Sequence, residues 1–181
     1  MGKCDAATRS QDRKSPRPRG VPELRPDSRY NQDNQKIVEK FAIGVNTLGV
    51  VAQTKNVQGA CTQYDVMSAI EEFDWYMQNV YGTQSVISLP GLAKTVNAGF
   101  NEGNIKWRQL PRDPQVMAQS VTPIDTSTGL LNPDCSAMQV LINTTDQQGE
   151  TIAYLVSQVK MFAAAHPSDK LELKLATGNV G

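Results

Sequence analysis

Few side chains in this sequence could do acid–base or nucleophilic chemistry. His166 is the only histidine, and it stands beside Pro167 at the end of a predicted helix. A Ser-His-Asp or Cys-His site would therefore depend on this one base. A histidine at a helix C-terminus also interacts favourably with the helix dipole. We interpret His166 as structural and expect no catalytic residue and no enzyme.

Carboxylates and glycines give no stronger signal. The run Glu71-Glu72-Phe73-Asp74 could suggest a catalytic pair, but neighbouring residues on a helix point apart. We interpret these acids as a solvated face. Gly91, Gly99 and Gly103 match no phosphate loop, so no cofactor is expected. Asn143-Thr144-Thr145 matches the glycosylation sequon, a triplet short enough to arise by chance.

The three cysteines, Cys4, Cys61 and Cys135, lack the close spacing of a zinc site, so we expect no metal. Cys4 lies in a polar leader, which leaves Cys61 and Cys135 as the informative pair.

One apolar stripe could form a binding surface. Leu92, Val96 and Phe100 share a helix face, and Trp107 follows after a Gly-Asn break. If nothing within the domain covers them, these four residues form an exposed patch for cargo or a partner. The alternative is that Phe100, Trp107 and also Trp75 belong to an ordinary core.

Length and charge narrow the class of protein. The 181 residues suffice for one domain, and 18 Lys and Arg balance 18 Asp and Glu, which argues against a nucleic-acid partner. No apolar stretch approaches the ~20 residues of a spanning helix. Residues 1–20 are basic and nearly lack large apolar groups, so we expect a disordered leader before a single domain at 21–181. A basic arm or a sequence junction would each explain the leader.

Hydrophobic periodicity predicts a first helix at 30–42 and then two βαβ units. The first unit has strands at 46–53 and 83–89 around a helix that a Thr62–Asp65 capping box begins. The second has strands at 136–144 and 170–175 around a helix at 149–165. A long helical and irregular insertion fills about 90–134, with a short helix after Pro90 and one helical turn near 114–120. The predicted fold class is α+β, a ferredoxin-like sandwich with strand order 4-1-3-2 and both helices on one face.

Many short motifs between residues 21 and 181 resemble, in order, the second periplasmic loop of bacterial resistance-nodulation-division (RND) transporters. Within this superfamily the motifs resemble those of the hydrophobe/amphiphile exporters, the predicted exporters of the MMPL-like branch. The motifs include Leu24-Arg-Pro-Asp-Ser-Arg-Tyr, Gly44-Val-Asn-Thr-Leu-Gly-Val-Val, Trp75-Tyr-Met-Gln-Asn-Val, Ser88-Leu-Pro, Val96-Asn-Ala-Gly-Phe-Asn-Glu-Gly, Lys106-Trp-Arg-Gln-Leu-Pro-Arg, Asp134-Cys-Ser and Leu175-Ala-Thr-Gly-Asn-Val-Gly.

The resemblance implies a non-catalytic porter domain on the periplasmic face of the inner membrane. Its partners would be the other periplasmic loop and the membrane helices of the parent transporter, and its cargo hydrophobic or lipid-like. The family's twelve membrane helices and acidic proton relay are missing, so this polypeptide alone is not expected to transport. We expect an excised loop or a truncated product that ends at Gly181. The rival is a stand-alone ferredoxin-like module that binds a small ligand or regulates, and a hydrolase comes third.

The predicted topology also pairs Cys61 with Cys135. Cys61 lies between the first strand and its helix, and Cys135 immediately precedes the third strand. These strands are antiparallel neighbours in the predicted sheet, so the end of one meets the start of the other. We therefore predict a disulfide, which an oxidising periplasm would permit. The alternative is two unrelated, semi-buried thiols.

Overall fold

The computed structural model describes residues 28–40, 47–55, 57–146 and 148–176. The predicted leader at 1–20 and the end of the chain after residue 176 lie outside them. The helices are α1 (Arg29–Lys40), α2 (Tyr64–Gln78), α3 (Leu89–Phe100), α4 (Pro114–Val121) and α5 (Gly149–Ala165), with 3-10 turns η1 (Ala60–Thr62), η2 (Ile105–Trp107) and η3 (Thr126–Thr128). The strands are β1 (Thr47–Thr54), β2 (Thr83–Ile87), β3 (Ala137–Thr144) and β4 (Leu171–Leu175).

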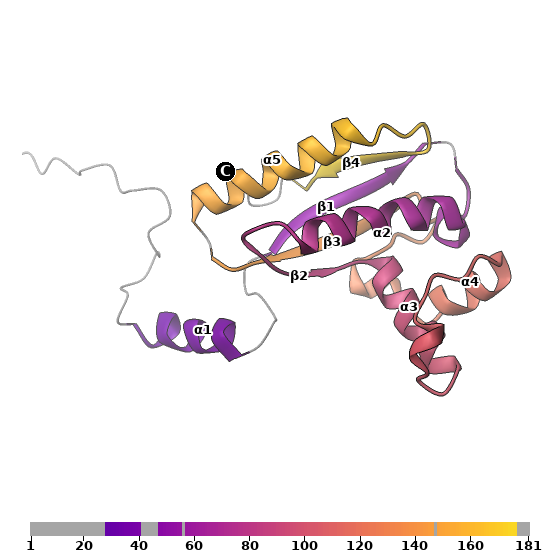
Figure 1. Cartoon of the computed structure of the whole chain (residues 1–181), viewed down its shortest axis with the longest axis horizontal. Coiled ribbons are helices and arrows are strands. Elements are labelled where there is room, and N and C mark those ends of the chain that lie inside the picture. Colours follow the sequence, from indigo (N-terminus) through magenta and orange to yellow (C-terminus); the bar gives the residue numbers. More distant parts are fainter. Residues whose placement is uncertain (1–27, 41–46, 56, 147, 177–181) are drawn as a thin grey trace, which may run out of the picture.

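The four strands form one antiparallel sheet in the order β2-β3-β1-β4, which is the predicted order 4-1-3-2 counted from the other edge (Figure 1). The central pair sets the register, with Val50 opposite Val140. On its other side Val50 lies opposite Leu175 and Thr54 opposite Leu171, so β4 runs antiparallel beside the second half of β1.

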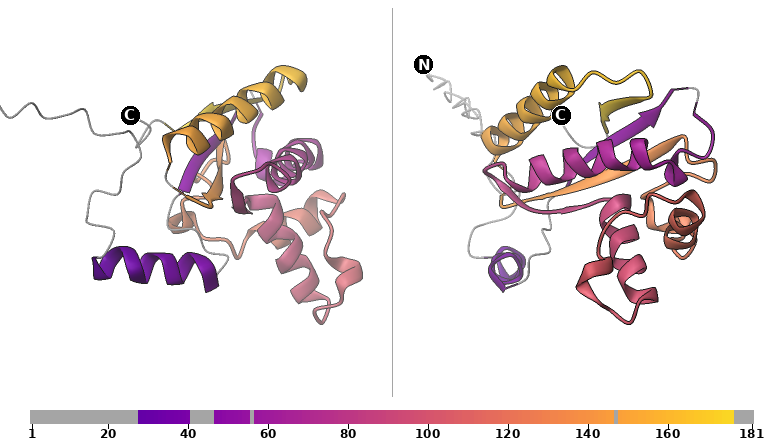
Figure 2. Two further views of the ribbon diagram at one scale, coloured as in Figure 1. Left: turned by 60° about the vertical axis from the view of Figure 1, so that its left-hand side comes forward. Right: turned by 45° about the vertical axis from the view of Figure 1, so that its right-hand side comes forward.

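The core lies between the sheet and two helices on one of its faces. α2 and α5 run side by side over this face, whereas α3 and α4 project beyond the end of β2 (Figures 1 and 2). Alternate residues of β1 and β3 are buried against the helices because successive side chains of a strand point to opposite faces. The predicted stripe of α2 supplies the opposing layer. The largest fully buried side chains of this core include Met67, Ile70, Phe73, Met77, Met138, Ile142 and Leu155.

Two sequence-based boundaries were wrong for local reasons. The predicted capping box does not form, because Thr62 belongs to η1, where its hydroxyl donates to the carbonyl of Gly59 over 2.8 Å, and Gln63 precedes α2 instead. The strand predicted to reach residue 89 ends at Ile87, because Ser88 caps α3. A serine side chain that binds a helix N-terminus is incompatible with a continuing strand ladder.

The predicted disulfide joins Cys61 in η1 to Cys135 just before β3, with Cα atoms 5.5 Å apart and a sequence separation of 74 residues. η1 also packs against α4. The bond therefore connects the start of α2 to the end of the insertion between β2 and β3. In the described ranges no helix combines the length and apolar character that crossing a bilayer requires.

We predict that replacing both cysteines, as Cys61→Ala/Cys135→Ala, lowers the free energy of unfolding by about 4 kcal/mol, because the open chain regains loop entropy in the unfolded state. Urea denaturation of the oxidised protein and the variant measures the difference. The reduced parent protein is the control and should unfold like the variant. A loss below about 1 kcal/mol would contradict the entropic account.

Candidate interaction surface on the insertion

The insertion begins with a strong helix start. The Ser88 hydroxyl accepts a hydrogen bond from the Gly91 amide over 3.2 Å, and Pro90 occupies the first turn, where its missing N–H costs nothing. Leu89 and Ala93 are fully buried against the core. These contacts fix the direction in which α3 leaves the sheet.

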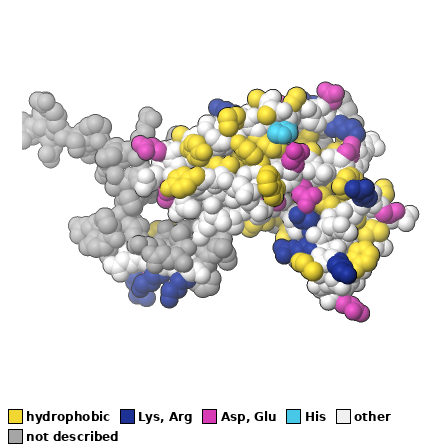
Figure 3. Space-filling view, in the orientation of Figure 1, with side chains coloured by type: hydrophobic (Ala, Val, Ile, Leu, Met, Phe, Trp, Pro, Cys, Tyr) yellow, Lys and Arg dark blue, Asp and Glu magenta, His cyan; other side chains and the backbone are white. Residues whose placement is uncertain are grey.

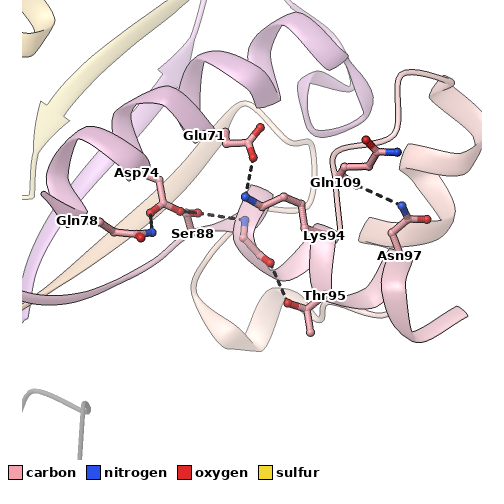
Figure 4. A network of polar contacts seen from close by, with 9 residues as sticks. Glu71, Asp74, Gln78, Ser88, Lys94, Thr95, Asn97 and Gln109 are labelled. Carbon is pink, nitrogen blue, oxygen red and sulfur yellow. Dashed lines mark hydrogen bonds and ion pairs between the residues drawn. The ribbon is translucent and has the colours of Figure 1, made fainter. Parts of the chain in front are cut away.

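A buried carboxylate connects α3 to α2. Asp74 is only 5% exposed, its carboxylate accepts a hydrogen bond from the Ser88 hydroxyl, and the Gln78 amide donates to it over 2.5 Å (Figure 4). A second contact joins the same two helices where Lys94 Nζ lies 2.6 Å from Glu71 Oε1. The prediction of a solvated acidic face is thus wrong for Asp74, because α3 covers that side of α2.

Burial raises the pKa of Asp74 above its ordinary value, because desolvation penalises the charged form. The hydrogen bonds from Ser88 and Gln78 and the charge of Lys94 act in the opposite direction. Desolvation is the largest effect, so the folded protein holds the proton of Asp74 more tightly than the unfolded chain does.

At its far end α3 turns back sharply. Glu102 and Gly103 both have left-handed backbone angles, with φ of 57° and 73°. The Asn104 side chain then caps η2 by accepting from the Lys106 amide over 3.0 Å. We call residues 100–108, from the last residue of α3 through η2, the tip.

Asn97 holds the tip against α3. Its side-chain Nδ2 donates to the carbonyl of Trp107 over 2.8 Å and to that of Gln109 over 3.2 Å, and Asn97 itself is buried. Figure 4 shows Asn97 pointing from α3 toward Gln109. One side-chain amide thus binds two backbone carbonyls of the segment that follows the tip turn. These two hydrogen bonds hold the backbone of the tip in place without a bound partner.

The tip presents large hydrophobic side chains to solvent. Phe100 is 66% exposed, Ile105 72% and Trp107 49%. Leu92 and Val96, the other two predicted surface residues, are half-buried and pack against the core. Of the four residues predicted to form the patch, only Phe100 and Trp107 are therefore exposed to solvent.

The alternative prediction, that the aromatic residues belong to the core, is wrong for Phe100, Trp107 and also Trp75, which is 67% exposed on α2. Ile105 was missed because it breaks the helical spacing of the stripe. Figure 3 shows hydrophobic and basic side chains next to one another over the α3 and α4 region.

A concave site lies elsewhere, between α2, the end of α5 and β4. This pocket has a volume of about 430 Å³ and a mixed lining, whose apolar residues include Ala69, Phe162 and Leu173. At its rim Lys55 pairs with Glu172 over 3.5 Å. We call it the α2–α5 pocket.

His166 lines the same pocket and has partners. Its ring stacks on Phe162 with centroids 4.2 Å apart, its Nδ1 lies 3.1 Å from the Phe162 carbonyl oxygen, and its Nε2 lies 3.6 Å from Glu72. These contacts are those of a helix-terminal histidine. Among the described residues, no three of His, Cys, Asp and Glu gather in a way that could hold a metal ion.

The glycosylation match has a structural role. Asn143 is buried in β3, where its Nδ2 donates to Ser85 over 2.9 Å and its Oδ1 accepts from Thr47 over 3.1 Å. The side chain thus bridges three strands, and attaching a glycan to it would break this contact.

We predict that Asp74 makes stability depend on pH. A raised folded pKa contributes stability that is complete below about pH 3.9, the unfolded value, and is lost as the pH rises through the folded pKa. Between the unfolded and the folded pKa, the free energy of unfolding of the parent protein should therefore fall relative to that of Asp74→Asn, which has no titrating group at position 74. Urea denaturation of both proteins from about pH 3 to about pH 7 measures the difference. A difference that stays constant with pH would contradict the raised pKa.

We also predict that Asn97→Leu costs about 2 kcal/mol of stability, because two carbonyls lose their donor. In a Trp75→Phe background Trp107 is the only indole, and its fluorescence anisotropy should fall as the tip gains freedom. Asn79→Leu is the matched control, since the Asn79 side chain donates to the Trp75 carbonyl at the end of α2 and lies outside the tip. Equal losses in the two variants would show that Asn97 has no special part in ordering the tip.

Comparison of the chain with protein-family models, with curated proteins and with solved structures finds no match. The interpretation of the surface therefore depends on its geometry, and the resemblance to the RND loop stays a prediction.

Proposed function

We propose that this chain is a ferredoxin-like, porter-type periplasmic domain of an RND-type exporter and that the tip contacts hydrophobic or amphiphilic cargo. The domain is non-catalytic in this proposal. Its partners are the other periplasmic loop and the membrane helices of the parent transporter. The sheet order and the two helices on one face support the ferredoxin-like assignment, to which the segment between β2 and β3 is an addition.

The observation that carries the proposal is the exposure of Phe100, Ile105 and Trp107 on an ordered loop. Large hydrophobic side chains that lie together on the exposed surface of a domain mark an interaction site. A flexible loop could turn such side chains toward the core. In this loop the Asn97 side chain holds the backbone by donating to the carbonyls of Trp107 and Gln109. The backbone of the loop therefore loses less conformational entropy when an apolar ligand binds.

The disulfide supports the location. Structural disulfides persist in oxidising compartments such as the bacterial periplasm and are rare in the cytosol. The bond between Cys61 and Cys135 is remote from the tip residues in sequence and needs no functional explanation of its own. It agrees with a domain that works outside the inner membrane.

The second candidate is a stand-alone ferredoxin-like module that binds a small ligand, and the α2–α5 pocket favours it. A volume of about 430 Å³ lies within the range of small-molecule sites. In that case the ligand would bind near Phe162 and His166, and the tip would not take part.

We predict that a single-chain amphiphile, lysophosphatidylcholine below its critical micelle concentration, binds at the tip. In the Trp75→Phe background it should shift the Trp107 emission to the blue as the indole leaves water. Phe100→Ser/Ile105→Ser should weaken binding by about tenfold or more, because the apolar contact area is lost. Tyr81→Ser/Met161→Ser is the control, since it removes two exposed hydrophobic side chains from other elements.

A pocket variant separates the two candidates. Ala163→Phe adds a ring to the lining of the α2–α5 pocket. Equilibrium dialysis measures binding at either place, because Trp107 emission reports only the tip. If this variant abolishes binding and the tip variant does not, the small-ligand module is the better account. Absence of binding to the parent protein would count against the cargo role altogether.

A further inference from the structure

The tip carries positive charge among its hydrophobic side chains. Lys106 and Arg108 stand on either side of Trp107, and both are exposed. Between residues 100 and 112 the only acid is Glu102, against the three basic residues Lys106, Arg108 and Arg112. Residues 21–181 as a whole hold twelve Lys and Arg against sixteen Asp and Glu. The tip itself has a net charge of +1, from Lys106 and Arg108 against Glu102, on a domain whose net charge is −4.

Structural ion pairs do not account for these charges. Lys94 contacts Glu71 and Lys170 contacts Asp65, whereas Lys106 and Arg108 make no ion pair within the described part of the chain. Arg112, by comparison, lies over the Tyr64 ring, 5.6 Å from its centroid. The two cations that flank Trp107 therefore remain available to an external anion.

We propose that the tip recognises an amphiphile with an anionic headgroup, such as a phosphate whose charge is not balanced within the headgroup. The apolar tail would lie on Phe100, Ile105 and Trp107, and the headgroup would meet Lys106 and Arg108. A guanidinium matches two phosphate oxygens at once, and an ammonium supplies a point charge beside it. This inference rests on the proposed function, because it names the class of cargo that the same surface takes.

The tail and the headgroup contribute differently to binding. Exposed charges interact weakly in water and are screened by salt, so a free phosphate ion gains little from two lysine or arginine side chains. An apolar tail alone would bind without regard to the headgroup. The combination predicts a preference for anionic over zwitterionic amphiphiles that weakens as the salt concentration rises.

The test compares two probes with the same acyl chain, lysophosphatidylglycerol and lysophosphatidylcholine, each below its critical micelle concentration. Trp107 fluorescence in the Trp75→Phe protein reports binding of both. We expect about fivefold or greater preference for the anionic probe, of the order that two favourable surface charges supply. Inorganic phosphate alone should give no shift.

Charge variants assign the preference to the tip. Lys106→Gln/Arg108→Gln should bind the two probes equally. The matched control is Lys36→Gln/Lys160→Gln, which removes two exposed lysines of α1 and α5 and should keep the full preference. A preference that survives in the tip variant, or disappears in the control, would overturn the inference.

The outcomes separate this inference from the proposed function. Equal binding of both probes by the parent protein, lost in Phe100→Ser/Ile105→Ser, would overturn the headgroup assignment and leave the cargo surface intact. Binding of neither probe would overturn both, and the acidic face of a protein partner would then become the candidate occupant of the tip.

Discussion

The buried contact between Asp74 and Ser88 determines how the insertion is attached to the sheet. Ser88 has two roles at one hydroxyl, since it donates to the carboxylate and accepts from the Gly91 amide. The first joins α3 to α2, and the second begins α3 directly after β2. Because a carboxylate is costly to bury without partners, α3 must stay where Ser88 and Gln78 satisfy Asp74. The position of everything beyond α3 follows from this contact.

The sequence predicts well those elements whose stability comes from periodic burial. The stripe Val66, Ile70, Phe73 and Met77 is buried as its spacing indicates, and α4 and α5 form where prolines and apolar residues place them. The strand order and the disulfide followed from combining short strands with one topology. These are global regularities, in which many weak signals agree.

Single polar residues were harder to interpret, because their environment is set by distant parts of the chain. Nothing beside Asp74 in the sequence shows that α3, fourteen residues later at Ser88, covers it. Asn97 lies within an apolar helix and looks like any exposed amide until the return of the chain at Trp107 brings two carbonyls to it. The nearest signal was its position between Val96 and Ala98, where a polar side chain on a short helix needs a partner.

The insertion is held at both ends, and this explains why its middle can expose hydrophobic groups. At its start Ser88 binds Asp74, and at its end Cys135 is bonded to Cys61. Both contacts are made with α2 or with the turn η1 that precedes it. The segment between them is therefore a loop whose two ends are attached to the same part of the structure. Fixing the ends of a loop reduces the conformations available to it, and Asn97 removes more of them at the tip itself. The side chains of Phe100, Ile105 and Trp107 are therefore kept in water by a backbone that cannot collapse onto the core, which is the arrangement that a surface for an apolar ligand requires.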